Sequence, residues 1–519
     1  MYLAGKILLT IYLYFISYFY TLSVPWSWTS LLRIAVIYAA VHVLCEKLTN
    51  IKVAISADRG KINWIFGAGV FAGTLAVMLL YYAGYYPGGF TPDTFNQWYQ
   101  VDKGFLLDWH PAIHTLLFLM LPSFICNNLA FVSFMQIVWL SLAMAYLGIV
   151  MERWGIKKSW VCVALALGIL NPASAITLSF VWKDTALTIF AVVLAGQIME
   201  IVFSDGEWLK QWQHPLAFGL FGALAMLMRH NAILLVAPMM LLVIFTYWRK
   251  VKYVCFFSGM WMIFFVVGIK GPLYHVLGVQ SHPQVTAEML GVPMTILANV
   301  LVHEPDSLDE DAREFLYRIG DQELWESTYE EGSWNSAKWM GADISNDIIE
   351  EVGASNVLRY TWHAIQREPY YAYRAVVKLF SVVWKPVGKE VPWAYEVSVH
   401  SYSLYPYEMK GISCIQKVLD AVRKISVEGT ALTTWSWHIG FFILLLLFVG
   451  ISRLKEGWER SLCWIPVLCY DFGTALLLCG HDFRFFSFNT VIIWPLMLIM
   501  FSDKNQKADD RLGENSDGN

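Results

Sequence analysis

Charged side chains are scarce in this chain. Asp, Glu, Lys and Arg make up 15% of its 519 residues, whereas hydrophobic residues make up 57%. Soluble domains of ordinary composition carry about a quarter charged residues, so this composition excludes a conventional soluble protein. Basic and acidic residues nearly balance, at 37 against 41, and they form no basic stripe of the kind that binds nucleic acid.

The sequence also lacks the common catalytic and metal-binding motifs. It contains no Gly-rich dinucleotide fingerprint, no phosphate-binding P-loop and no HExxH zinc motif. Its 8 cysteines form no CxxC pair and fall almost entirely within or at the ends of apolar runs, which is typical of membrane packing. The sequence therefore indicates no metal site, and the cofactor requirement stays open.

Long apolar runs are what the sequence has instead. Each run is about 18 to 22 residues long, which is enough to cross a bilayer as a helix. The first is interpreted as a retained helix, because no small-residue cleavage site follows it. We predict an all-α polytopic membrane protein of about 12–13 transmembrane helices. The expected crossings are 7–24, 29–45, 64–84, 129–150, 159–180, 185–203, 215–229, 231–248, 253–271, 435–452, 461–480 and 486–502.

Basic residues between these runs set the expected orientation. Lys and Arg gather after the second, fourth, eighth and tenth runs, and loops of this kind face the cytoplasm. We therefore expect a protein of the cell membrane with both chain ends in the cytoplasm. The short apolar stretch 111–126 is interpreted as a re-entrant or surface-lying helix, because a further crossing would place Arg153 and Lys157 outside.

This orientation divides the chain into four parts. We expect a transmembrane core that includes a first extracytoplasmic loop at 85–112, then a mainly helical extracytoplasmic domain. C-terminal transmembrane helices and a disordered cytoplasmic tail follow. The boundaries of the four parts are 1–271, 272–434, 435–502 and 503–519.

The first outer loop carries the most informative polar residues. Asp93 follows a Gly-Gly and Thr-Pro turn and opens a helix, where it could also be a plain N-cap. Gln97 and Trp98, on the same helix, could hydrogen-bond to a sugar and stack on it. The loop ends in Asp108 and His110, just before the next apolar segment.

Three further polar clusters lie at ends of apolar runs on the same expected face. Charges at a membrane boundary are costly unless they are paired or wet, so they favour a functional role. Plainer interpretations remain open: a snorkelling Lys beside an N-cap Asp, a hairpin tip solvated by headgroups, and an internal Asp–Arg pair. The clusters are Lys183-Asp184, Arg229-His230-Asn231 and His481-Asp482-Phe483-Arg484. Asp471 lies in the middle of an apolar run and needs a partner that the sequence does not identify.

Together these residues resemble the GT-C superfamily of integral-membrane glycosyltransferases, which includes protein O-mannosyltransferases and the aminoarabinose transferase of lipid A. The resemblance implies a helical membrane core with an outer domain above the active site. It also implies a polyprenyl-phosphate sugar donor, Asp93 as catalytic base, and donor phosphate bound by Lys183, Arg229 and Arg484. The implied substrate-binding residues are Gln97, Trp98, Asp108, His110, Asp184, His230, Asn231 and Asp482.

Two departures from that family leave the metal dependence and the sugar class open. Thr94 follows Asp93 where relatives often carry a second acid, and Pro111 stands alone where they often carry two prolines. The expected reaction is an inverting transfer to an extracytoplasmic hydroxyl of a cell-envelope glycan, lipid or protein. A flippase or transporter for lipid-linked glycans is the first alternative. A polysaccharide ligase or polymerase is the second.

Overall fold

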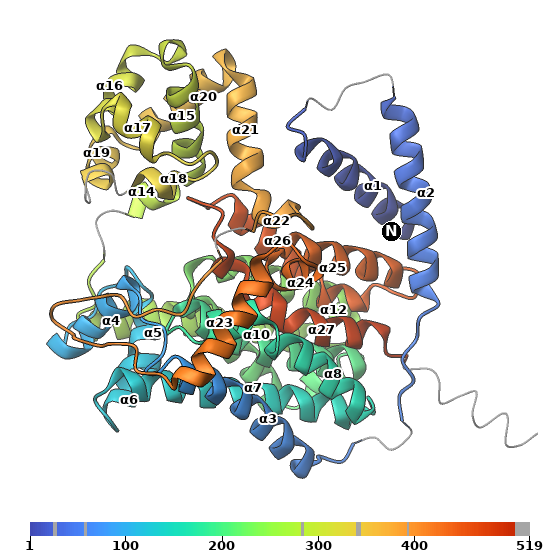
Figure 1. Ribbon diagram of the computed structural model, residues 1–519. Coiled ribbons are helices and arrows are strands. Elements are labelled where there is room, and N and C mark those ends of the chain that lie inside the picture. The colour runs from blue at the N-terminus through green and yellow to red at the C-terminus, as the bar shows by residue number, and fades with distance from the viewer. Residues whose placement is uncertain (24–28, 57–59, 282–284, 339–343, 392–393, 504–519) are drawn as a thin grey trace, which may run out of the picture.

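A computed structural model describes residues 1–23, 29–56, 60–281, 285–338, 344–391 and 394–503. Within these ranges the regular structure is helical, and extended segments meet only as isolated bridges. The expected all-α class is therefore confirmed for the described part of the chain. Most helices form one large body, from which a smaller lobe stands apart (Figure 1).

Six segments are long and apolar enough to cross a membrane, or up to eight if each of two bent pairs counts as one span. This supports a multi-pass membrane protein, although the number is lower than the 12–13 helices expected. The six are α1 (Tyr2–Phe19), α3 (Trp64–Gly84), α7 (Leu129–Arg153), α10 (Lys183–Phe203), the stretch His230–Val276, and Phe483–Phe501, which contains α27 (Phe488–Phe501). The bent pairs are α8 (Lys158–Ile169) with α9 (Pro172–Leu178), and α24 (Ala431–Trp437) with α25 (Ile439–Arg453).

The bends have local causes. Asn171 precedes Pro172, and the residue before a proline is disfavoured in the helical region, so α8 ends there and α9 starts at an angle of 67°. His438 has extended backbone between α24 and α25, where the angle is 81°. Other expected crossings are short helices, namely α11 (Gln213–Met228) and α26 (Ile465–Ala475).

The stretch α12 (Ile233–Gly268) folds back on itself. Val251 has non-helical dihedral angles, and the Sγ of Cys255 lies 4.0 Å from the carbonyl oxygen of Val243. Residues on either side of Val251 therefore pack antiparallel, at the position where the sequence predicts a cytoplasmic loop between two crossings.

The segment 111–126 forms a short broken helix. It consists of α5 (Ala112–His114), a π-helical turn η1 (Thr115–Met120) and α6 (Leu121–Ser123). At 1.5 Å per residue these turns are about 18 Å long, too short for a hydrocarbon core of about 30 Å. Their length agrees with the expected re-entrant or surface-lying helix.

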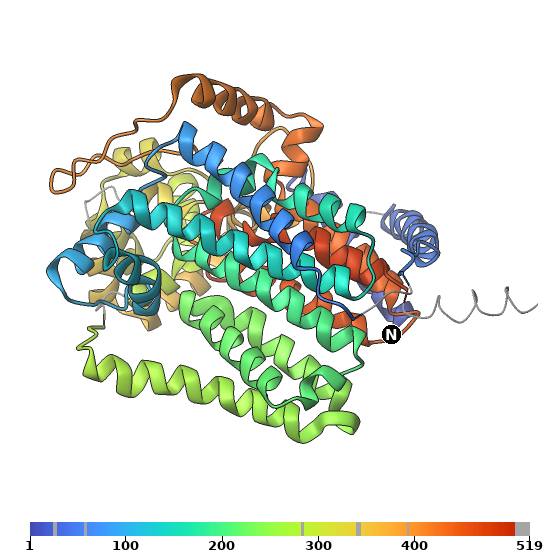
Figure 2. The same ribbon diagram turned by 90° about the horizontal axis from the view of Figure 1, so that it is seen from below.

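Helix α10 lies at the centre of the large body, and 94% of its apolar window is buried (Figure 2). It is apolar on all sides, as a helix enclosed by others must be. Lys183 begins it, whereas Glu200 near its other end pairs with Arg153 and accepts a hydrogen bond from Trp154 Nε1. Residues expected on the two sides of the membrane thus lie at opposite ends of α10.

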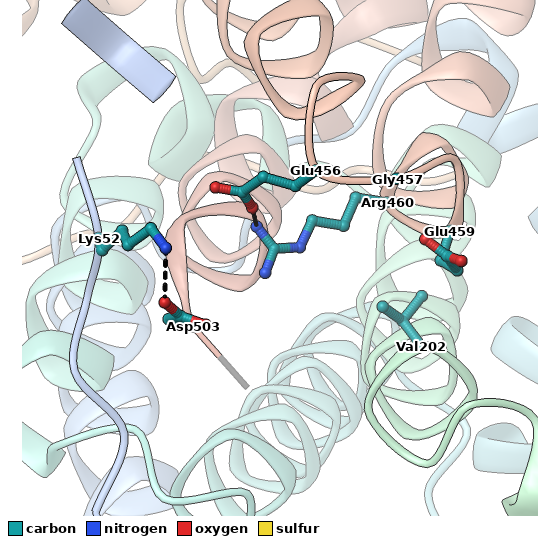
Figure 3. Close-up of a pocket in the computed structure, with 7 residues that line it drawn as sticks. All are labelled: Lys52, Val202, Glu456, Gly457, Glu459, Arg460 and Asp503. Atoms are coloured by element: carbon teal, nitrogen blue, oxygen red, sulfur yellow. Dashed lines mark hydrogen bonds and ion pairs between the residues drawn. The ribbon is translucent and has the colours of Figure 1, made fainter. Parts of the chain in front are cut away.

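A cavity of about 340 Å³ lies at the Glu200 end of α10 (Figure 3). Its basic residues are already paired: Lys52 with Asp503 at 2.8 Å, and Arg460 with Glu456 at 2.5 Å. The remaining lining residues are Val202, Gly457 and Glu459. We assign it no role in the chemistry, because the sequence-predicted outer site lies at the other end of the helix.

The smaller lobe has its own hydrophobic core, built from residues between Ala287 and Ala364 together with Cys479. Its helices are α14 (Val285–Met289), α15 (Gly291–His303), α16 (Glu310–Ile319), α17 (Gln322–Thr328), α18 (Trp334–Lys338), α19 (Ile344–Val352) and α20 (Ala354–Arg367). Helix α21 (Pro369–Leu379) leads back to the large body (Figure 1).

The rest of the expected outer segment packs on the membrane body. Val397 and partly buried residues of 394–411 join the large core, as does Leu419 of α23 (Ser413–Val427). At the opposite side of the body, α1 pairs with α2 (Ser30–Thr49) (Figure 1). The predicted tail from 504 onward and the end of the first run at 24 lie outside the described residues.

Candidate functional site

Backbone pairing brings the first loop to the start of α10. Gly89 donates a hydrogen bond to the carbonyl oxygen of Ser179 at 3.0 Å and accepts one from Val181 at 3.2 Å. A side chain at position 89 would collide with the ring of Phe180, so this close approach requires glycine. The pairing places the loop that carries Asp93 beside the segment that leads into Lys183.

Asp93 is not the N-cap of its helix. Thr91 has the N-cap position of α4 (Pro92–Lys103), and its backbone N–H donates to Thr94 Oγ1 at 3.2 Å. The carboxylate of Asp93 is thus not needed to cap the helix, and 32% of the side chain remains accessible. The plain capping interpretation of Asp93 is therefore wrong.

Arg484 is the direct partner of Asp93. Its Nη1 lies 3.0 Å from Asp93 Oδ2, and its Nε lies 3.1 Å from Asp482 Oδ2. Asp482 also caps the short 3-10 helix η7 (Phe483–Phe486), since its Oδ1 accepts from the backbone N–H of Arg484 at 2.9 Å. One guanidinium thus pairs with two carboxylates. Asp93 and Arg484 are 391 positions apart in the sequence.

Lys183 contacts a histidine instead of a carboxylate. Its Nζ lies 3.1 Å from His110 Nδ1. An ammonium group only donates hydrogen bonds, so Nδ1 accepts and the ring proton resides on Nε2. Among the described residues no carboxylate lies within ion-pair distance of Lys183. Lys183 is therefore the cation of this site that has no carboxylate partner among the described residues.

The two groups in the outer loop have shifted pKa values. Burial by itself would raise the pKa of Asp93, but Arg484, His110 and Lys183 together lower it well below its usual range. Burial, and then the charge of Lys183, lower the pKa of His110 to about 3. At neutral pH Asp93 is consequently a carboxylate and His110 is neutral.

Arg229 belongs to a second network. It forms a buried ion pair with Asp184, and its Nε donates to Asn231 Oδ1 at 2.6 Å. Asn231 in turn donates to Thr474 Oγ1 at 2.8 Å, which connects the polar turn after α11 to α26. The predicted residues of this turn and of the start of α10 are thus brought together.

The two networks meet at the ring of Phe485. The guanidinium carbon of Arg229 lies 4.3 Å from the ring centroid, and that of Arg484 lies 5.2 Å from it. The two distances add to less than a Debye length of about 10 Å at moderate salt, so each guanidinium lies in the field of the other. Asp93, Lys183, Arg229 and Arg484 therefore form one charged cluster.

Asp108 and His230 belong to a separate group of polar contacts. Lys270 joins them, with its Nζ 3.6 Å from Asp108 Oδ2 and 3.3 Å from His230 Nδ1. Tyr274 donates from its hydroxyl to Asp108 Oδ1 at 3.3 Å. The sequence did not indicate Lys270, because it lies at the end of the expected crossing 253–271 and is not part of a polar cluster.

Gln97 and Trp98 are engaged within the protein. Gln97 Nε2 lies 2.9 Å from both His114 Nδ1 and Thr115 Oγ1, and the Trp98 side chain is buried. Gln97 thereby joins α4 to the broken helix that follows the loop. Neither forms a hydrogen bond with the Asp93–Arg484 pair.

Tyr395 is a site residue that the sequence did not reveal. Its hydroxyl donates to Asp482 Oδ1 at 2.8 Å, and its ring lies edge-on to Trp182 at 5.0 Å. Burial and the nearby Asp482 raise the pKa of Tyr395 well above its usual value, so the hydroxyl keeps its proton. A chain with 26 tyrosines gave no signal that singled this one out.

The cluster is suited to bind an anion beside a carboxylate. Within the described ranges no group of three or more His, Cys, Asp or Glu side chains is arranged to hold a metal ion. Comparisons with protein-family models, with curated proteins and with solved structures find no match to this chain. The geometry of the cluster is therefore the basis for assigning a function.

Proposed function

We propose that this chain is a membrane glycosyltransferase with a GT-C-like core of about 12–13 helices and both ends in the cytoplasm. It would transfer a sugar from a polyprenyl-phosphate donor to an extracytoplasmic hydroxyl of a cell-envelope glycan, lipid or protein. One observation carries the proposal. An accessible carboxylate, Asp93, and three cations from distant segments meet at the ends of apolar helices.

The cations suit the phosphate of the donor. A lipid phosphate must leave water to reach this site, and that step is costly unless opposite charge awaits it. Lys183 has no carboxylate partner among the described residues, so its ammonium is the first contact that we assign to the phosphate. Arg484 is the second, because its guanidinium can exchange Asp93 for an oxyanion of the phosphate while it stays paired with Asp482.

Asp93 would act as the base. A hydroxyl is a poor nucleophile, and a positioned carboxylate takes its proton while the oxygen bonds to the anomeric carbon. The bond from that carbon to the phosphate oxygen breaks in the same displacement, and the cations stabilise the leaving phosphate. Such a single displacement inverts the anomeric centre.

The Asp93–Arg484 ion pair implies an order of events. While Arg484 neutralises Asp93, the carboxylate has a low pKa and is a weak base. Phosphate bound to Arg484 and Lys183 would offset their charge and restore basicity to Asp93. The donor would therefore bind before the acceptor hydroxyl is activated.

The role that we assign to Arg229 differs from the phosphate binding that the sequence predicts. Its Nε donates to Asn231 and its Nη1 pairs with Asp184, so it is less free than Lys183 to turn towards a ligand. We assign it the role of fixing Asp184, and with it the start of α10. Its positive charge adds to the field at the phosphate.

The proposal is tested by transfer of a radiolabelled sugar from polyprenyl phosphate in membranes. Asp93→Asn should lower the rate at least about 10²-fold, which is the low end of general-base contributions. Asp102→Asn is the matched control, since Asp102 lies near the end of the same helix and its partners among the described residues are Lys103 and Tyr405. Equal rates for the two variants would refute the base role. Donor translocation without transfer would instead indicate a flippase, and transfer of whole chains a ligase or polymerase.

A further inference from the structure

Asp471 lies in the middle of α26, and its side chain is fully buried in the membrane body. Its Oδ1 accepts a hydrogen bond from Asn489 Nδ2, at 2.8 Å, in the first turn of α27. In the described part of the chain no cation forms an ion pair with it. An ionised carboxylate in this position would be strongly penalised.

Two oxygens of this pair have no partner. Asp471 Oδ2 and Asn489 Oδ1 are both buried and form no hydrogen bond. Both are acceptors if Asp471 is ionised, so neither could satisfy the other. A protonated carboxylic acid has one donor, and a single proton on Oδ2 would satisfy both atoms.

We propose that Asp471 is a neutral carboxylic acid that forms a closed ring with the amide of Asn489. In this ring Asn489 Nδ2 donates to Asp471 Oδ1, and Asp471 Oδ2 donates to Asn489 Oδ1. The two planar groups are complementary in this way because each carries one donor and one acceptor. The ring joins α26 to α27 without placing a charge in the apolar interior.

The ring holds the turn that carries Arg484. On the same helix as Asp471, Tyr470 donates from its hydroxyl to the carbonyl oxygen of Phe485 at 3.0 Å. The turn is therefore fixed on one side by Tyr470 and on the other by Asn489, five positions after Arg484. Asp471 is thus a positioning residue, and this part of the inference rests on the proposed function, whereas its protonation state does not.

Asp471→Asn and Asp471→Leu test the ring. An asparagine closes the same ring amide to amide with no titratable proton, so the unfolding temperature in detergent should match the unchanged protein. Leucine leaves the Asn489 amide unpaired, and the unfolding temperature should fall. If Asp471 were ionised, Asp471→Asn would remove a buried charge and supply the missing donor, so the unfolding temperature should rise above that of the unchanged protein.

Infrared difference spectra of the unchanged protein and Asp471→Asn provide a direct readout. We expect loss of the carbonyl stretch of a protonated carboxylic acid at neutral pH; loss of a carboxylate band would overturn the proposal. The exchanged pair Asp471→Asn with Asn489→Asp should fold and regain the acid band. Its failure to fold would also contradict the ring.

Transfer activity tests the positioning role separately. Asp471→Asn should stay within about threefold of the unchanged protein, whereas Asp471→Leu should lose at least about fivefold, as expected when both buried hydrogen bonds of the ring are lost. Equal activity of the two variants would refute positioning. Absence of transfer in the unchanged protein would refute the proposed function, while the infrared result would still decide the ring.

Discussion

Replacing Arg484 by glutamine should destabilise the fold, and a second replacement at Asp93 should recover part of the loss. Arg484 is the cation for both Asp93 and Asp482, at 3.0 and 3.1 Å, and its side chain is only 19% exposed. Arg484→Gln leaves the two carboxylates facing each other without a cation. In the double variant with Asp93→Asn, one of these charges is gone and two amides can hydrogen-bond.

The expected size of the effect follows from burial. Removing one partner of a buried ion pair costs about 3–5 kcal/mol. Because 32% of the Asp93 side chain is accessible, solvent screens part of this interaction, and we expect about 2 kcal/mol for the coupling between the two positions. The coupling is the amount by which the double variant differs from the sum of the single variants.

Unfolding in detergent, followed by tryptophan fluorescence, measures this coupling. The control cycle combines Arg484→Gln with Asp102→Asn, whose effects should add within about 0.5 kcal/mol because the two sites share no partner. If the cycle with Asp93→Asn is equally additive, the ion pair does not exist in the folded protein. The electrostatic argument for an ordered reaction would then fail as well.

Three further predictions follow. Arg229→Lys should lower transfer at least about tenfold although the charge is kept, because lysine lacks the planar guanidinium that pairs with Asp184 and donates to Asn231. A rate equal to that of the unchanged protein would contradict this. In the folded protein the pKa of His110 is about 3, below its value in the unfolded chain. The contribution of neutral His110 to the free energy of unfolding is therefore lost as pH falls from about 6.5 towards 3. Unfolding temperatures of His110→Gln should therefore depend less steeply on pH in that window. A topology test uses intact cells that express this protein without its native cysteines. Asp93→Cys should react with an impermeant thiol reagent, whereas Lys455→Cys should react only after lysis.

Four ionisable residues that the sequence singles out lie together in the structure, and their roles stay predictions. Asp93, Lys183, Arg229 and Arg484 each stand out as ionisable groups at the ends of apolar runs, where an unpaired charge is costly. Their order along the chain, together with the charge of the intervening loops, was enough to assign them to one face. Their partners were harder to predict, because which carboxylate meets which cation depends on helix packing.

The residues that the sequence missed share a physical reason. Tyr395 and Asn489 are uncharged, and Lys270 is a single charge at the end of the expected crossing 253–271, so none of them stands out by composition. Asn489 could have been noticed as an amide within an apolar stretch, where it needs a partner such as Asp471. Each of them acts through a contact with a residue distant in sequence.

Fewer helices than expected are long and apolar enough to cross a membrane, because bends and breaks divide some of the apolar runs into shorter helices. The run 159–180 is continuous in composition, yet the Asn171-Pro172 step divides it into α8 and α9. The proline signal was available in the sequence and predicts a probable helix boundary. The break at His438 has no comparable signal, since histidine is tolerated inside helices.

The most direct test of the proposed function is an experimental structure of the purified protein with bound polyprenyl phosphate. The phosphate should lie within hydrogen-bond distance of Lys183 Nζ and the Arg484 guanidinium, with Asp93 no longer paired to Arg484. A phosphate bound at the opposite end of α10, among Lys52 and Arg460, or bound with the Asp93–Arg484 pair intact, would contradict the proposed function and its order of events.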